Sequence, residues 1–141
     1  MRLRRCLGLC VRASLAAVLA ATVSCGESKE TRQGTSASQP VISWEKAAPH
    51  VGQNVVLEGP VVSAHFARTS KGQPTFLNLG KPHPDPGRFT VVIWGSSRGR
   101  FSGAPEDLYR GKLIRVSGTI TTYRGAPQII ADGPEDIEIV R

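Results

Sequence analysis

Apolar and polar residues alternate in short blocks from residue 54 to the end of the chain, the spacing of β-strands that bury one face. The alternation is clearest in the segment 112–123. One row of this segment is mostly apolar and is expected to face a core: Ile114, Val116, Gly118 and Ile120. The other row is mostly polar and is expected to face outwards: Leu113, Arg115, Ser117 and Thr119. The chain is therefore expected to contain a β-domain whose strands follow one another at short intervals.

The same signals predict five strands, at 54–68, 74–79, 88–94, 112–123 and 128–140, with a turn at 132–134 inside the last. A short helix is predicted at 104–109, because proline and acidic residues suit its first turn and Gly111 its end. One helical turn is predicted at 44–48, with Trp44 as a plug for the core. This order is that of an OB-fold, an all-β, five-stranded Greek-key barrel with a short helix between strands 3 and 4. Gly59 is expected to bend the long first strand.

The first 24 residues have the composition of an export signal. Arg2, Arg4 and Arg5 come first, Arg12 extends the basic region, and residues 13–23 form an uncharged run of mainly Ala, Leu and Val. This run is too short to span a bilayer, which takes roughly 20 apolar residues, whereas secretory signals contain about 7 to 15. Residues 1–24 are therefore predicted to be a cleaved signal peptide.

Cys25 is predicted to carry a lipid anchor. The residues Thr22-Val23-Ser24-Cys25 resemble the lipobox of bacterial lipoproteins, although Thr22 stands where leucine is usual. The alternative is an ordinary signal peptide, which would leave a soluble exported protein with one free thiol. Residues 25–40 are polar and without periodicity, so we expect a flexible tether followed by a monomeric OB-fold domain at 41–141. The expected location is the cell envelope, with the domain outside the cytoplasmic membrane.

Charge and cysteine content change once the signal is removed. Taking Arg2, Arg4, Arg5 and Arg12 from the 18 basic residues leaves 14 against 11 acidic residues, a net charge of +3. The whole-chain pI of about 9.9 is therefore not a nucleic-acid signature by itself. Cys6 and Cys10 lie inside the signal, so neither a disulfide nor a cysteine metal site is expected in the domain.

Four segments carry a resemblance to a known family: 51–59 (VGQNVVLEG), 76–80 (FLNLG), 89–94 (FTVVIW) and 111–129. They are similar to a family of small bacterial OB-fold domains, often exported, described as nucleic-acid-binding-like and sometimes attached to secreted nucleases. The resemblance covers about residues 42–140. It is specific for the fold and implies nucleic-acid binding only through the fold, which does not determine function.

An OB-fold that binds single strands uses the exposed face of strands two and three between two loops, here about 67–73 and 123–127. Such binding needs cations for phosphates and aromatic faces for bases. The candidate cations are Arg68, Lys71, Arg88, Arg115 and Arg124, and the candidate aromatic residues are Phe66, Phe76 and Tyr123. The proline-rich loop 81–87 is expected to be stiff and to shape one rim of the groove.

Each candidate also has a plainer interpretation. Phe76, Phe89 and Trp94 are more often core residues than binding platforms in a small barrel. Tyr123 suits a turn-packing role as well as a binding role, and most arginines at this net charge are solvated.

Catalysis and cofactors find little support in the sequence. His50, His65 and His83 occur singly, without metal-ligand spacing, and the acidic residues 132–138 lie in a turn and edge-strand context. The chain is therefore not expected to be an enzyme and no metal or cofactor is predicted. Two functions remain open: a tethered module that binds single-stranded nucleic acid or another polyanion, and an envelope module that holds a protein or a glycan.

Overall fold

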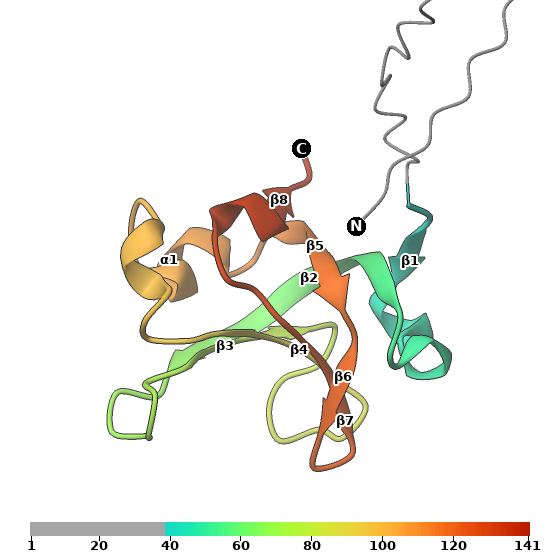
Figure 1. Ribbon diagram of the computed structural model, residues 1–141, viewed down its shortest axis with the longest axis horizontal. Coiled ribbons are helices and arrows are strands. Elements are labelled where there is room, and N and C mark those ends of the chain that lie inside the picture. Colours follow the sequence, from blue (N-terminus) through green and yellow to red (C-terminus); the bar gives the residue numbers. More distant parts are fainter. Residues whose placement is uncertain (1–38) are drawn as a thin grey trace, which may run out of the picture. The chain divides into compact units, whose positions relative to one another are not determined.

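The computed structural model describes residues 39–141. The predicted signal peptide, Cys25 and nearly all of the predicted tether lie outside these residues. The described part contains eight strands and one short α-helix (Figure 1). The strands are β1 (Val41–Ser43), β2 (Asn54–Phe66), β3 (Thr75–Leu79), β4 (Phe89–Ile93), β5 (Leu113–Thr119), β6 (Thr121–Tyr123), β7 (Ala126–Ile130) and β8 (Ile137–Ile139). The helix is α1 (Pro105–Tyr109), and 3-10 turns lie at 44–46, 48–50, 98–100 and 134–136.

The strands pair in the order β6-β7-β4-β3-β2-β5-β8, with β1 parallel to β2 beside this path. β2 is shared between two halves of the sheet: residues 54–60 pair with β5, and residues 61–66 pair with β3. β5 and β6 are separated only by Ile120, so one bent segment pairs with β2 at its start and with β7 at its end. The path of hydrogen bonds keeps free ends at β6 and β8 and is not a closed ring. This strand order, with α1 between β4 and β5, confirms the predicted all-β, OB-type fold.

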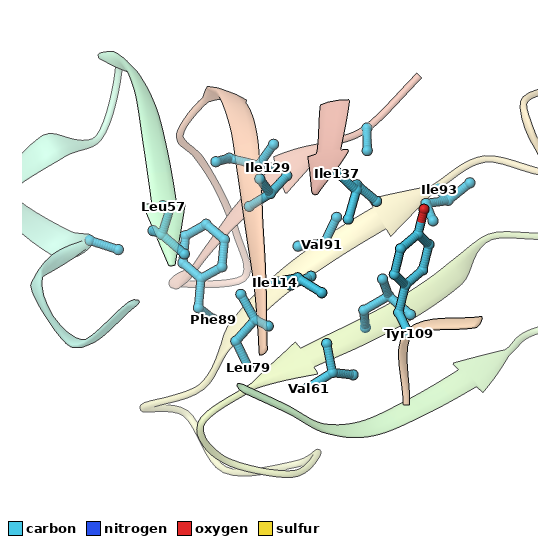
Figure 2. Packing of buried hydrophobic residues seen from close by; sticks show 14 of the residues in the cluster. Leu57, Val61, Leu79, Phe89, Val91, Ile93, Tyr109, Ile114, Ile129 and Ile137 are labelled. Carbon is cyan, nitrogen blue, oxygen red and sulfur yellow. The ribbon is translucent and has the colours of Figure 1, made fainter. Parts of the chain in front are cut away.

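The core lies between the two halves of the sheet (Figure 2). Phe89, Leu77 and Ile129 are fully buried there, and Tyr109 of α1 packs in the same cluster. Burial raises the pKa of the Tyr109 hydroxyl above its usual value. The prediction for segment 112–123 is confirmed, because Ile114, Val116 and Ile120 are buried while Leu113 and Ser117 are exposed.

Trp44 packs against the core through two glycines rather than lying fully inside it. A Cβ atom on Gly59 would lie 2.7 Å from Cδ1 of Trp44, and one on Gly80 would overlap the ring atoms Cζ2 and Cε2. The indole therefore fills a slot that exists because both positions lack a side chain. Gly59 was predicted as the bend of the first strand, but the register irregularity of β2 falls between Val61 and Ser63.

Three other expectations need correction. Trp94 was predicted to be a core residue, yet 39% of it is exposed, because β4 ends at Ile93. β1 was not predicted, since three residues give no readable alternation. The segment 128–140 is not one strand but β7 and β8 with a 3-10 turn between them.

Candidate functional site

The outer face of strands β2, β3, β4 and β7 carries two rows of side chains in register. Residues that lie opposite each other on neighbouring strands share a face of the sheet, so each row runs across four strands. The first row is polar: Ser63, Asn78, Thr90 and Gln128. The second row is mostly apolar: His65, Phe76, Val92 and Ile130. This face is the one that the OB-type fold leaves outside its core.

The polar row is held by its own hydrogen bonds. The Asn78 side-chain amide donates to Oγ of Ser63 at 3.0 Å, and Oγ1 of Thr90 donates to Oδ1 of Asn78 at 3.2 Å. Asn78 and Thr90 are both buried, so these bonds satisfy groups that would otherwise be costly to remove from water. The row therefore forms a rigid polar floor with fixed donor and acceptor directions.

Two loops rise beside this face and enclose a groove of about 910 Å³. The β3–β4 loop contributes His83, Pro84, Pro86 and Arg88, and the β6–β7 turn contributes residues 123–126. Figure 1 shows both connections at the lower edge of the domain. The floor is formed by His65, Phe76, Asn78, Thr90 and Gln128. The lining residues include two arginines and two histidines, and none of them is acidic.

The one acidic side chain of the β3–β4 loop, Asp85, interacts with other residues of the same loop. The Asp85 carboxylate accepts from the backbone N–H of Gly87 at 2.8 Å and lies 3.7 Å from Nζ of Lys81. Arg88 donates through Nη1 to the Asp85 backbone oxygen at 2.7 Å. Its Nε is buried and has no hydrogen-bond partner within residues 39–141. The loop thus presents a positioned guanidinium to the groove and keeps its carboxylate away from it.

The β6–β7 turn supplies the other wall. Arg124 and Gly125 have φ values of +50° and +80°, as a two-residue hairpin turn requires. Tyr123 precedes them with 60% of its surface exposed, the largest value among the large hydrophobic residues of the described part. The Arg124 guanidinium carbon lies 5.4 Å from the centre of the Tyr123 ring. An exposed aromatic ring and a cation therefore stand together at the rim of the groove.

Four of the eight predicted binding residues line this groove, namely Phe76, Arg88, Tyr123 and Arg124. Arg68 and Lys71 are exposed on the β2–β3 loop and are not among the lining residues. Arg115 lies on the half of the sheet formed by β2 and β5, where its Nε donates to Glu58 at 2.8 Å. The structure thus groups half of the set and places the rest elsewhere.

Phe66 supports an arginine of the protein itself. The Arg98 guanidinium carbon lies 3.6 Å from the Phe66 ring centre, and that of Arg68 lies 5.5 Å from it. Arg98 also donates to both carboxylate oxygens of Glu106, at 2.8 and 3.2 Å, and to Oγ1 of Thr75. The hydrogen bond from Arg98 holds the pKa of Glu106 below its usual value. This network joins α1 to β2 and β3 and occupies the Phe66 ring.

The sequence matches no protein-family model. No significant match was found among curated proteins. An aspartyl-tRNA synthetase from Entamoeba histolytica is similar in structure, with a TM-score of 0.49 and 12% identity over 79% of this chain and 23% of that one. The hypothetical protein ygiW from E. coli is also similar in structure, with a TM-score of 0.44 and 16% identity over 73% of this chain and 92% of that one.

A third similar structure is an OBody, AM1L10, solved in complex with hen egg-white lysozyme, with a TM-score of 0.41 and 16% identity over 65% of this chain and 83% of that one. The present chain spans about a quarter of the length of the aspartyl-tRNA synthetase. Because these identities and TM-scores are low, the fold is assigned from the strand order and the strand pairing. The fold is of the OB type.

Sequence reasoning did not select the polar floor of the groove. Asn78, Thr90 and Gln128 belong to three strands that are distant in sequence, and only their register brings them together. The signal in the sequence was polar residues inside otherwise apolar strands, as in FLNL at 76–79. His83 lies in the proline-rich loop that was expected to shape one rim, and the structure places that loop there.

Outside the groove the described residues offer little further chemistry. A smaller hollow of about 320 Å³ lies over β5 and β6 and includes Asp132 and Asp136. The Asp136 carboxylate already accepts from two backbone N–H groups, those of Asp132 and Gly133. No group of three or more potential metal ligands is found in residues 39–141. None of the helices in that range has the length and apolar character needed to cross a bilayer.

Proposed function

We propose that this protein binds single-stranded nucleic acid in the groove over β3 and β4, and that it does so outside the cytoplasmic membrane, tethered through Cys25. One observation carries the proposal: the groove joins the exposed Tyr123 ring, the half-buried Phe76 ring and two arginines to a polar floor, and it contains no carboxylate among its lining residues.

The chemistry of a single strand fits each part of this groove. Bases offer flat faces that stack on aromatic side chains, with about 1–3 kcal/mol per base, and Phe76 and Tyr123 are placed for such contacts. Phosphates attract cations, which Arg88 and Arg124 provide. The side-chain amide of Gln128, which is only partly buried, can hydrogen-bond base edges.

Salt dependence tests the proposal. The purified protein is expected to bind single-stranded oligonucleotides weakly, because few cations line the groove. Each phosphate contact contributes about −0.7 to the slope of log affinity against log salt, so a total slope of roughly −1 to −3 is expected. Fluorescence anisotropy with labelled DNA and RNA oligonucleotides at several salt concentrations measures it. Absence of binding to every oligonucleotide at low salt would exclude the proposal and favour the envelope module for a protein or a glycan.

The tether is supported by the sequence alone, through the basic and apolar residues before Cys25 and the polar stretch after it. Two or three acyl chains, at about 0.8 kcal/mol per buried CH₂, hold a protein on a membrane permanently, whereas one chain does not. Replacing Cys25 by Ser is therefore expected to move the protein out of the membrane fraction or to leave it unprocessed. Cell fractionation and gel mobility measure this, with Cys10→Ser as the matched control inside the signal. Unchanged attachment and mobility of Cys25→Ser would exclude the anchor.

A further inference from the structure

We propose that Trp94 is a second stacking platform, outside the groove, which extends the path of a bound single strand from the β6–β7 turn to the β2–β3 loop. This inference rests on the proposed function and assigns a binding role to a residue that the groove itself does not include. In Figure 1 the β2–β3 loop stands at the lower left of the domain, and the β3–β4 loop and the β6–β7 turn overlap in the view to its right.

Trp94 stands next to the apolar row of the binding face. Phe76 pairs with Val92, and Trp94 follows two residues after Val92 on the same side of the chain. The pairing of β3 with β4 ends at Thr75 and Ile93, so Trp94 lies directly past the end of this row. Trp94 is absent from the core cluster, and 39% of it is exposed. Its position thus continues the row that contains Phe76.

The indole is held in place by the loop before β3. A Cβ atom on Gly72, which has a φ of +77°, would lie 2.9 Å from Cε3 and Cζ3 of Trp94. The backbone N–H of Gly95 donates to the Gly72 oxygen at 2.9 Å, which fixes the loop on the end of β4. A ring fixed against backbone loses little freedom when a base stacks on its open part. The exposed part of the Trp94 ring is apolar surface in contact with water, and a stacked base would cover it.

The charges around Trp94 suit a phosphate backbone. The β2–β3 loop, residues 67–74, carries Arg68 and Lys71 and no acidic residue. Both side chains are exposed. The Arg68 guanidinium lies over the Phe66 ring, which the register places on the opposite face of the sheet from Phe76, so it does not belong to this surface. Lys71 directly precedes the Gly72 that packs on the indole, so a strand that leaves the groove over Phe76 would meet a flat aromatic surface followed by one cation. At the other end of the path, Arg124 lies over the Tyr123 ring.

Oligonucleotide length separates this platform from the groove. We expect Trp94→Ala to bind a trinucleotide of thymidine as the unchanged protein does, and to bind a decanucleotide about 5- to 160-fold more weakly, the effect of losing one stacked base. Trp94→Phe, which keeps an aromatic ring, is expected to restore most of that loss. Thermal unfolding of each variant shows whether its fold is kept. Leu113→Ala, an exposed apolar residue on the other half of the sheet, is the matched control.

Tryptophan emission gives a second readout that folding defects do not mimic. The decanucleotide is expected to quench the emission of the unchanged protein, and the quenching should disappear in Trp94→Phe, because Trp44 is packed against Gly59 and Gly80. Equal decanucleotide affinity in Trp94→Ala, or quenching that persists in Trp94→Phe, would overturn the platform and leave the groove as the site. An equal loss for both oligonucleotide lengths would also overturn it. Failure of the unchanged protein to bind either oligonucleotide would overturn the proposed function as well.

Discussion

Replacing Gly80 by Ala is expected to lower the free energy of unfolding by about 3 kcal/mol. Gly80 has a φ of +70°, a conformation that costs an L-residue about 1–2 kcal/mol. The added Cβ would also overlap the Trp44 ring, which has to move out of its slot against the core. Overpacking of this kind costs typically 1–3 kcal/mol. Urea unfolding at equilibrium measures the sum of both effects.

Gly111→Ala is the matched control. Gly111 has nearly the same backbone conformation, with a φ of +72°, but its added Cβ would meet no atom within 4 Å. We therefore expect only the backbone cost of about 1–2 kcal/mol. In the double variant Trp44→Ala/Gly80→Ala, the loss should be smaller than the sum of the two single losses, because the clash is gone. Equal destabilisation by Gly80→Ala and Gly111→Ala would show that Trp44 does not occupy this slot.

Tyr123, at the end of β6, and Arg124, in the turn that follows, are expected to affect binding in different ways. Tyr123→Ala should weaken oligonucleotide binding by about 1–3 kcal/mol with little change in the salt slope, because stacking does not involve phosphate charge. Arg124→Ala should instead reduce the magnitude of the salt slope by about 0.7, the contribution of one phosphate contact. Anisotropy titrations at several salt concentrations measure both quantities.

Two variants serve as controls for this comparison. Tyr123→Phe retains the ring and is expected to bind as the unchanged protein does. Lys112→Ala removes one positive charge, as Arg124→Ala does, but Lys112 is exposed directly before β5 and does not line the groove. Its effect on the slope should be small. If Lys112→Ala and Arg124→Ala change the slope equally, the net charge of the protein rather than the groove controls binding, and the proposed site is wrong.

The fold could be predicted from local signals because each main strand carries its own. Alternation in 112–123 placed Ile114 and Val116 in the core, and the helix signal at 104–109 fell between the correct strands. The failures concern contacts between distant segments. The alternation signal does not show that β1 would pair with β2, nor that the glycines at 59 and 80 would form a slot for Trp44. Trp94 was misplaced because its apolar character was read as burial.

The site could be predicted only in part for a related reason. Tyr123 was chosen because it begins the loop 123–127, which an OB-type fold places at its binding face, and loop position follows from strand order. Arg88 was chosen as a cation, and the structure places it in the groove. Phe66 was chosen on its residue type, and nothing near it in sequence shows that Arg98 would cover its ring. Arg115 has the right charge, but the alternation of β5 places it beside Glu58 on the other half of the sheet. Residue type alone therefore does not separate a binding side chain from a paired one.

The most direct test of the central claim is to map the bound strand on the protein by the amide chemical-shift changes that a thymidine oligonucleotide causes at low salt. The account predicts changes at β3, β4, the loop 81–88 and residues 121–128, with little change at β1, β8 and α1. Changes confined to β1, β5 and β8, or no changes at any oligonucleotide concentration, would contradict it.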